Sequence, residues 1–241
     1  MPDTRNHRGP HPEDSALFHQ DAHAALVRAV RELSWLRSRD YAIPSALKLV
    51  GDRHHLTSRQ RTAVLRSTCS DEALARRQHK QVSREAIKDR RLLLDGYNVL
   101  TTVEAALGNG ILLLGRDGCV RDMASLHGSY RKVEETLPAI HLIGRFMAEA
   151  GVDAAHWYLD SPVSNSGRLG AHIREAAEMQ GWPWEVELVQ DPDPVLAEAG
   201  DVVATADSVI LDQCRRWFNL AREVVTARVP GARIVDLSGE S

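Results

Sequence analysis

From residue 92 onward, short apolar runs alternate with helical segments, and this alternation restricts the fold more than any other feature of the sequence. The runs LLLDGYNVL (92–100), AHWYL (155–159) and VVATA (202–206) are typical of buried strands. Strands that alternate with helices of about 10 to 20 residues predict a parallel sheet with helices on both faces. The expected class is therefore α/β.

Three further runs extend this pattern to the end of the chain. ILLL (111–114), WEVELV (184–189) and ARIVDL (232–237) also have the composition of strands. We expect all the strands to join one sheet, and we expect a single long helix over 208–228.

The chain before this region has a different character. Ala25, Leu26, Val30 and Leu33 recur at helical spacing, and almost no strand signal is present before residue 91. The capping-box spacing of Thr57 and Gln60 marks the start of one helix. We therefore predict three regions: a disordered tail (1–20), an all-helical basic domain that binds nucleic acid (21–90) and a Rossmann-like α/β domain (91–241). The tail is assigned from its richness in Pro, His and charged residues.

The net charge of −3 conceals two opposite halves. Residues 1–91 contain 18 Lys and Arg against 11 Asp and Glu, a net of +7, whereas residues 92–241 contain 12 against 22, a net of −10. A basic helical surface can neutralise phosphates, although it is equally typical of an ordinary solvated face. The residues expected on this surface are Arg53, Arg59, Arg61, Arg66, Arg76, Arg77, Lys80 and Arg84.

The cysteine content and the hydropathy of the chain indicate in which cellular compartment the protein is found. Cys69, Cys119 and Cys214 are too few and too widely spaced for a disulfide framework or a CxxC metal site. No window approaches the roughly 18 apolar residues of a membrane-spanning helix, and the polar N-terminus has no apolar signal core. We expect a cytoplasmic protein without a membrane partner.

Three of the expected strands end in aspartate: Asp95, Asp160 and Asp207. In an open parallel sheet the carboxyl ends of the strands lie at one edge, where ligands bind. Carboxylates gathered there require a cation, and hard oxygen ligands favour Mg²⁺ or Mn²⁺. We therefore expect these three aspartates to be catalytic and, with Asp212, to bind the metal. Other acids considered for the site are Asp122, Glu104 and Asp201.

Each aspartate also has a purely structural interpretation. Asp95 lies in an Asp-Gly turn, Asp160 lies in Asp-Ser-Pro, and Asp207 is a suitable N-cap for the next helix. It is their occurrence at three strand ends that favours an acidic functional site.

Several neighbouring side chains are candidates for binding a phosphate substrate. The loop Ser161–Arg168 is small, polar and leads into a helix N-terminus, which suits a phosphate, but an ordinary capped loop has the same composition. Tyr97 can stack on a base or pack on the sheet edge. The substrate-binding candidates are Asn98, Ser164, Ser166, Arg168, Arg131 and His127.

Two motifs resemble those of the PIN-like nuclease superfamily, particularly its NYN branch. Asp95-Gly96-Tyr97-Asn98 matches the Asp-Gly-x-Asn element after the first strand, and Thr205-Ala206-Asp207 matches the Thr-x-Asp element after a late strand. The resemblance implies a PIN-like fold and metal-dependent RNA cleavage, with Asp95 and Asp207 as metal ligands. It does not assign Asp160, and it implies an acid on a helix before the Thr-x-Asp strand, for which Glu198 and Asp201 are candidates.

The whole stretch from about 25 to 237 also resembles an uncharacterised prokaryotic family built from a pair of domains of unknown function. The segments that carry this resemblance are LVGDRHHLTSRQRTAVLR, LLLDGYNVL, DSPVSNSGRLGAHIR and VVATADSVILD. The first of them also resembles a helix-turn-helix over a short length. This closer resemblance implies no activity.

The sequence thus predicts a nuclease that uses Mg²⁺ or Mn²⁺ and acts on RNA. A non-catalytic nucleic-acid-binding or adaptor protein that retains the fold is the alternative. A nucleotide-binding or phosphatase-like enzyme is a third reading, although the chain has neither GxGxxG nor GxxxxGK[ST].

Overall fold

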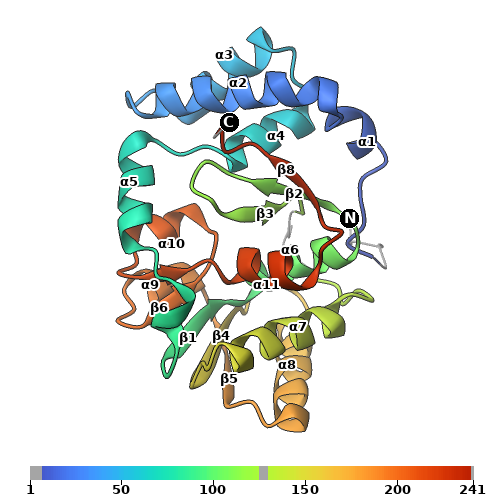
Figure 1. Cartoon of the computed structure of the whole chain (residues 1–241), viewed down its shortest axis with the longest axis vertical. Helices are drawn as coiled ribbons and strands as arrows, with labels where there is room; N and C mark the ends of the chain where they lie inside the picture. Colours follow the sequence, from blue (N-terminus) through green and yellow to red (C-terminus); the bar gives the residue numbers. More distant parts are fainter. Residues whose placement is uncertain (1–6, 125–129, 240–241) are drawn as a thin grey trace.

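The computed structural model describes residues 7–124 and 130–239, and it places a helical part on an α/β part (Figure 1). In the described part of the chain, no helix is long and apolar enough to cross a membrane. The chain is helical before its first strand. The elements there are α1 (Asp14–Leu17), α2 (Gln20–Arg37), α3 (Ile43–Arg53), α4 (Ser58–Arg66), α5 (Asp71–Lys80) and a 3₁₀ turn (Arg84–Ile87).

The capping box predicted at Thr57 is confirmed. The Thr57 hydroxyl accepts the backbone N–H of Gln60 at 3.3 Å, and the Gln60 side chain accepts the backbone N–H of Thr57 at 3.0 Å. Both groups would otherwise be unsatisfied donors at the helix start, so the pair fixes where α4 begins.

The main sheet has five parallel strands in the order β5-β4-β1-β6-β7, so the predicted α/β class is confirmed. Its strands are β1 (Arg91–Asp95), β4 (Ala154–Asp160), β5 (Trp184–Val189), β6 (Val202–Ala204) and β7 (Trp217–Phe218). The helices that accompany it are α6 (Gly96–Leu107), α7 (Thr136–Glu149), α8 (Ser166–Gln180), α9 (Pro192–Ala197), α10 (Ser208–Gln213) and α11 (Leu220–Arg228).

Alternating residues of β1 face opposite sides of this sheet. Leu92 and Leu94 join the core formed with α6, α7, α8 and α11, whereas Leu93 joins a second core with α9 and α10. All three leucines are at most 5% exposed. A strand buried on both faces explains why the run before Asp95 is continuously apolar rather than alternating.

The expectation of one sheet is wrong, because three strands form a separate sheet. It comprises β2 (Ile111–Leu114), β3 (Val120–Asp122) and β8 (Arg233–Asp236), in the order β3-β2-β8. β3 pairs antiparallel to β2, and β8 pairs parallel to it. Residue composition identifies ILLL as a strand, but it cannot show which sheet the strand joins.

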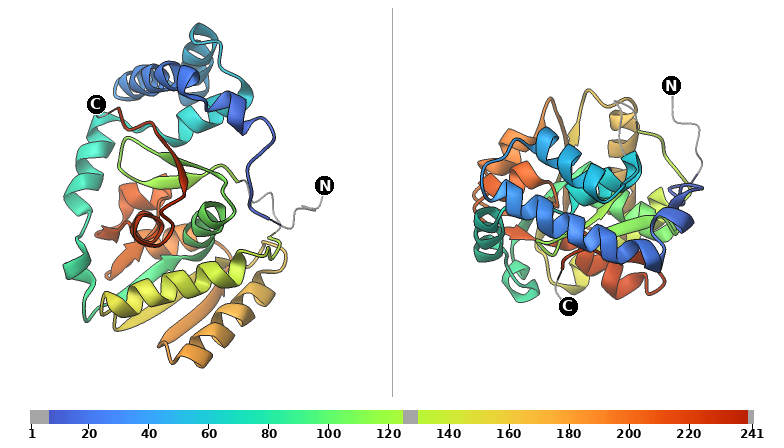
Figure 2. Two further views of the ribbon diagram at one scale, coloured as in Figure 1. Left: turned by 45° about the vertical axis from the view of Figure 1, so that its right-hand side comes forward. Right: turned by 90° about the horizontal axis from the view of Figure 1, so that it is seen from above.

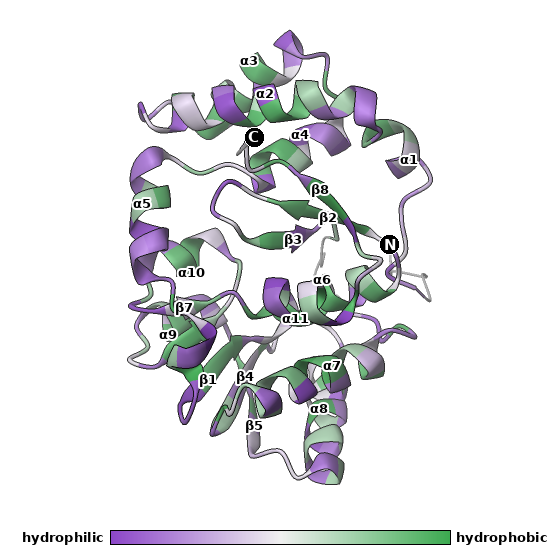
Figure 3. Ribbon diagram, in the orientation of Figure 1, coloured by the Kyte–Doolittle hydropathy of each residue, from purple (hydrophilic) through white to green (hydrophobic). Residues whose placement is uncertain are grey.

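The helical part packs on this second sheet and shares a core with it. Ile111 and Leu113 of β2 belong to the same buried cluster as Leu26 and Leu33 of α2. Leu112, which points to the other face, joins the core of the main sheet instead. Figure 3 shows hydrophobic residues on β2 and on the parts of α2 and α4 nearest to it. The small sheet therefore connects the helical part with the main sheet.

The single helix expected over 208–228 is also interrupted. α10 ends at Gln213, and the extended backbone of Cys214 leads into β7 before α11 begins. Trp217 in this interruption is fully buried, and its indole N–H donates to the carbonyl of Arg77 at 2.8 Å. The burial of Trp217 and its hydrogen bond to α5 outweigh local helix propensity here.

The described part of the segment assigned to a disordered tail is packed against the protein. Arg8 is 5% exposed, and its Nε donates to Glu104 at 2.9 Å; Asp14 is fully buried and pairs with Arg59 at 2.6 Å. The left view of Figure 2 shows the segment running from α1 toward α6. Composition alone does not reveal these two ion pairs, because both partners lie far away in sequence.

Candidate functional site

The carboxyl end of β1 lies where the order of the strands reverses. After β1 the chain places β4 and β5 on one side, and it then returns through α9 to place β6 on the other. Helices that leave adjacent strands in opposite directions open a crevice, which is the usual ligand site of such sheets. A cavity of about 490 Å³ occupies this place, and we call it the acidic pocket. It is lined by Arg66, Asp95, Tyr97, Asn98, Thr101, Thr102, Arg121, Asp122, Ala124, Asp193, Ala206, Asp207 and Ser208.

Asp95 is the last residue of β1 and is 9% exposed. The hydroxyl of Thr205 donates to its Oδ2 at 2.8 Å across the β1–β6 pair. Burial raises the pKa of Asp95 to about 7, and the nearby carboxylates of Asp207 and Asp193 add to the rise. A buried carboxylate beside two others is therefore poised to bind a cation.

Asn98 and Thr205 fix the backbone that carries Asp207. The backbone N–H of Ala206 donates to Asn98 Oδ1 at 2.8 Å, and the N–H of Asp207 donates to the Thr205 hydroxyl at 2.9 Å. The two motifs that resemble the NYN branch are thus hydrogen-bonded to each other. Thr205 contacts both Asp95 and Asp207, so it links the two acids directly.

Asp207 has the position required by each of the two interpretations that the sequence left open. Its Oδ1 accepts the N–H groups of Val209 and Ile210 at 2.7 and 3.3 Å, so it is the N-cap of α10. The same carboxylate lines the acidic pocket. Capping leaves an acid with a second oxygen that can bind a ligand, so the structural interpretation does not exclude the functional one.

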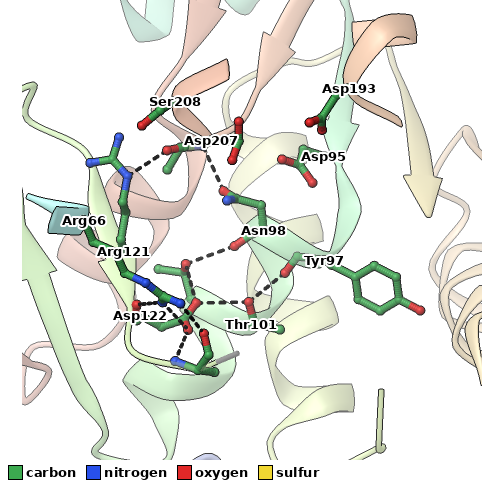
Figure 4. Close-up of a pocket in the computed structure, with 13 residues that line it drawn as sticks. Arg66, Asp95, Tyr97, Asn98, Thr101, Arg121, Asp122, Asp193, Asp207 and Ser208 are labelled. Carbon is green, nitrogen blue, oxygen red and sulfur yellow. Dashed lines mark hydrogen bonds and ion pairs between the residues drawn. The ribbon is translucent and has the colours of Figure 1, made fainter. Parts of the chain in front are cut away.

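Asp193 is the acid that sequence reasoning missed. It lies in the first turn of α9, where its N–H donates to Asp191 Oδ1 at 3.1 Å. Burial raises the pKa of Asp193 to about 6, with further contributions from Asp207, Asp191 and Asp160. In Figure 4 the carboxyl groups of Asp95, Asp193 and Asp207 face the same space. The signal in the sequence was Asp-Pro-Asp-Pro, in which Pro192 favours a helix start.

The opposite wall of the acidic pocket carries two arginines. Arg66, from α4, donates to the carbonyls of Asp122 and Ala124 at 2.5 and 2.9 Å. Arg121, from β3, donates through Nε to the carbonyl of Ala206 at 2.8 Å. The helical part therefore contributes Arg66 to a pocket whose acids all come from the α/β part.

Asp122 ends β3 between these two walls and is 8% exposed. Its Oδ2 accepts the hydroxyls of Thr101 and Thr102 at 3.0 and 3.2 Å, and its Oδ1 accepts the N–H of Ala124 at 2.6 Å. These contacts hold the end of β3 against α6, so Asp122 shapes the floor of the acidic pocket.

A buried network of charges supports the segment around Asp207. Asp117 accepts hydrogen bonds from Arg77 at 2.6 Å and from Arg121 at 2.7 and 2.9 Å. Arg121 holds the carbonyl of Ala206, and Arg77 holds the carbonyl of Ser208 at 3.2 Å. The residues on both sides of Asp207 are thus hydrogen-bonded to arginines that share one carboxylate.

Asp212 does not reach the acidic pocket. Its two oxygens accept Nε and Nη2 of Arg77, each at 2.8 Å, because the side chain points from α10 toward α5. Asp160 does not line the pocket either, although it follows β4 as predicted. Burial raises the pKa of Asp160, and Asp191 adds to the rise. The structure therefore brings Asp95 and Asp207 of the expected set together with Asp193, and Asp122, which was also considered, lines the same pocket.

The remaining candidates have other partners. Glu104 is fully buried and accepts hydrogen bonds from Arg8, Tyr130 and Thr136. Asp201 pairs with Arg91 at 2.6 Å on the surface, and Glu198 is the C-cap of α9. Tyr97 is 4% exposed, and its ring packs on that of Tyr130.

The substrate-binding candidates separate into two groups. Asn98 lines the acidic pocket, whereas Arg131 and Arg168 line a second cavity. The carbonyl of Ser164 accepts the N–H of Tyr130 at 3.1 Å, and the hydroxyl of Ser166 contacts the carbonyl of Ser161 at 3.4 Å. His127 lies outside the described residues.

Much of the basic surface expected on the helical part is engaged in ion pairs. Arg59 pairs with Asp14, Arg61 with Asp52 at 2.7 Å, and Arg53 with Glu32 at 3.4 Å. Arg76 pairs with Glu72 and Asp212, and Arg77 is fully buried. Lys80 donates a hydrogen bond to the carbonyl of Asp212, and the guanidinium of Arg84 lies over the ring of Phe146. Pairing with acids reduces the charge available for phosphates, so the net charge of the region overstates its basic surface.

The chemistry of the acidic pocket suits a hard cation, although its geometry is open. Among the described residues, no three His, Cys, Asp or Glu side chains are placed so as to hold one metal ion together. Every acidic donor of the pocket is a carboxylate oxygen, which is the ligand type of Mg²⁺ and Mn²⁺. Mg²⁺ commonly binds through one or two carboxylates, several waters and the phosphates of a substrate. Two of the three acids therefore provide sufficient donors.

Comparison with known proteins identifies relatives over most of the chain. The family described as "Domain of unknown function (DUF5616)" matches residues 84–223, and that described as "Protein of unknown function (DUF434)" matches residues 25–80. Uncharacterized protein MJ0935 of Methanocaldococcus jannaschii is 30% identical over 187 residues, which cover 78% of this chain and 89% of the archaeal protein. No solved structure matches the chain. The predicted pairing of two domains of unknown function is confirmed.

Proposed function

The chain belongs to the DUF5616 family, and from the geometry of its acidic pocket we propose that it is a metal-dependent nuclease that cleaves RNA. The observation that carries this proposal is the meeting of Asp95, Asp193 and Asp207 at the topological switch point of a parallel sheet. Three carboxylates are concentrated there, and burial raises the pKa of Asp95 and of Asp193, so the arrangement favours binding of a divalent ion.

The roles of the side chains follow from their positions. Two of the acids Asp95, Asp193 and Asp207 would hold Mg²⁺ or Mn²⁺. The bound ion would supply positive charge to offset the substrate phosphate and a coordinated water for attack. Asn98 and Thr205 hold Asp95 and the backbone next to Asp207 in place through the hydrogen bonds described above. Arg66 on the opposite wall would attract the phosphodiester, whereas Arg121 holds the carbonyl of Ala206 next to Asp207.

The order of the acids along the chain supports a PIN-like assignment of the α/β part. An acid ends the first strand, a second lies on a helix before the Thr-x-Asp strand, and a third follows that strand. This is the pattern implied by the sequence resemblance, with Asp193 in the place for which Glu198 and Asp201 were considered. RNA, rather than DNA, is proposed as the substrate on the strength of that resemblance.

Cleavage of a mixed pool of single-stranded RNA in Mn²⁺ tests the proposal. We expect wild-type protein to cleave the pool, Asp95→Asn and Asp207→Asn to reduce the rate at least about a hundredfold, and EDTA to abolish it. Asp201→Asn is the matched control, because Asp201 is a surface acid paired with Arg91. Equal cleavage by wild type and Asp95→Asn contradicts the proposal. Salt-sensitive RNA binding without turnover would support the non-catalytic alternative.

A further inference from the structure

A second cavity lies outside the acidic pocket and has the opposite charge. It has a volume of about 250 Å³, and we call it the basic cavity. None of its described lining residues is acidic, and four of them carry a basic side chain. The lining residues are Tyr130, Arg131, Lys132, Asn165, Arg168, Leu169 and His172.

Two hydrogen bonds hold the two sides of the basic cavity together. One side is the segment 130–132, and the other is the start of α8, where Arg168 and His172 lie one turn apart. The Asn165 side chain donates to the carbonyl of Tyr130 at 2.9 Å, and the N–H of Tyr130 donates to the carbonyl of Ser164 at 3.1 Å. These two hydrogen bonds bring cations from separate segments to one place, so their convergence belongs to the fold.

The acidic pocket and the basic cavity adjoin the same pair of tyrosines. Tyr97 lines the acidic pocket and Tyr130 lines the basic cavity. Their rings pack against each other with centroids 5.3 Å apart. Tyr97 is also two residues after Asp95, so the tyrosine pair connects the end of β1 with the segment that lines the basic cavity. Tyr97 is 4% and Tyr130 1% exposed, so the pair forms a buried partition with one cavity on each side.

We propose that the basic cavity binds a backbone phosphate of a single-stranded nucleic acid, at a position flanking the phosphate in the acidic pocket. This inference rests on the proposed function, because it takes the acidic pocket as the place of cleavage. Arginine and lysine side chains bind phosphates through charge-assisted hydrogen bonds, and the exposure of Arg131, Lys132 and Arg168 allows a strand to reach them. A polyphosphate strand is a ligand that satisfies both cavities at once.

RNA substrates of different length distinguish the contribution of the basic cavity from that of the acidic pocket. A dinucleotide has one phosphodiester, which the acidic pocket takes, whereas an RNA of about 12 nucleotides also reaches the basic cavity. We expect Arg168→Glu to raise KM for the longer RNA about tenfold, with kcat and dinucleotide cleavage unchanged, because it reverses the charge at a flanking phosphate. Arg145→Glu, which changes another exposed helical arginine outside both cavities, should behave as wild type.

The salt dependence of binding gives a readout that does not require cleavage. Affinity for single-stranded nucleic acid falls with salt, with a slope of about −0.7 for each neutralised phosphate. In EDTA, Arg168→Glu should therefore reduce the slope for the 12-nucleotide RNA by about 0.7, and Arg145→Glu should leave it unchanged. A thermal midpoint equal to that of wild type confirms that each variant is folded.

The two measurements distinguish the possible failures. If wild type cleaves both RNAs and Arg168→Glu matches Arg145→Glu in KM and in salt slope, the basic cavity is not a phosphate site and this inference is wrong. If wild type cleaves neither RNA, the proposed function is wrong, and the salt slope alone then tests whether the basic cavity binds a phosphate. A slope reduced by Arg168→Glu then supports nucleic-acid binding at the basic cavity, and an unchanged slope overturns it.

Discussion

At the residue scale, Asp207 has a structural role as an N-cap, and the same carboxylate has the position that the proposed function requires. It caps α10 through Oδ1 and also lines the acidic pocket. Asn is as good an N-cap as Asp, whereas Ala is not. The two substitutions therefore separate the roles that the sequence presented as alternatives.

We predict that Asp207→Asn keeps the stability of the fold and loses metal-dependent cleavage. Asp207→Ala should lose cleavage and also lower the free energy of unfolding by about 1 kcal/mol, because α10 loses its cap. Urea denaturation in EDTA measures the stability of both variants. A loss of stability in Asp207→Asn as large as that in Asp207→Ala would show that charge, not capping, is what the fold requires.

Asp95 gives a second prediction at this scale. Without a metal ion, burial of its carboxylate, together with repulsion by Asp207 and Asp193, raises its pKa, so its charge destabilises the folded state. In EDTA at pH 8, Asp95→Asn should raise the free energy of unfolding by roughly 1 to 2 kcal/mol. Adding Mn²⁺ should raise the thermal midpoint of wild type more than that of the variant. A less stable variant in EDTA would contradict this account.

At the scale of elements, local signals were predictable and long-range partners were not. The capping box at Thr57, the strand before Asp95 and the motif ending at Asp207 all depend on neighbours within a few residues. The second sheet depends on the pairing of β2 with β8, more than 100 residues later in the chain. An apolar run of four residues contains no information about that partner.

The candidate site shows the same division. Asp95, Asn98 and Asp207 were predicted because strand ends and short motifs place them. Asp212 lies outside the acidic pocket because it pairs with Arg77, 135 residues away, and no local pattern reveals that partner. Asp193 was missed because Asp-Pro after a strand is a common turn, and only the crossover of α9 brings it to β1.

The Arg77–Asp117–Arg121 network joins three elements and gives a prediction about stability. Asp117→Asn should lower the free energy of unfolding at pH 7 by about 3 kcal/mol, because it leaves two arginines without their buried partner. Asp71→Asn, which breaks the exposed pair with Arg116, should cost less than about 1 kcal/mol. Urea denaturation of the two variants measures the difference. Equal losses would show that the network contributes no more than a surface pair.

The same network predicts a dependence on pH. Burial alone would raise the pKa of Asp117, but Arg121 and Arg77 outweigh it and hold the pKa well below its usual range. A carboxylate with a lowered pKa in the folded state stabilises the protein above its unfolded pKa and loses that contribution as the pH falls. The free energy of unfolding should therefore drop below about pH 4, and the drop should be smaller in Asp117→Asn. Parallel acid titrations of the two proteins, followed by circular dichroism, would measure it.

At the scale of the whole molecule, the helical part and the small sheet form one core. Leu33 of α2 is fully buried with Leu113 of β2, so neither part buries its apolar surface alone. We predict a single unfolding transition for the full chain. Leu33→Ala should lower its midpoint as one step, at a cost of about 2 to 4 kcal/mol. Calorimetry would contradict this if it resolved two transitions, of which the variant shifted one.

The shared core also limits whether the two halves of the chain can be made as separate proteins. The matched families divide the chain between residues 80 and 84, yet the face of β2 that carries Ile111 and Leu113 is covered by helices from the first half. A gene for the second half alone would produce a protein with an exposed apolar sheet and without Arg66. Two such halves, made as separate polypeptides, would have to assemble as an obligate heterodimer. The face of β2 that carries Ile111 and Leu113 would then form part of the subunit interface.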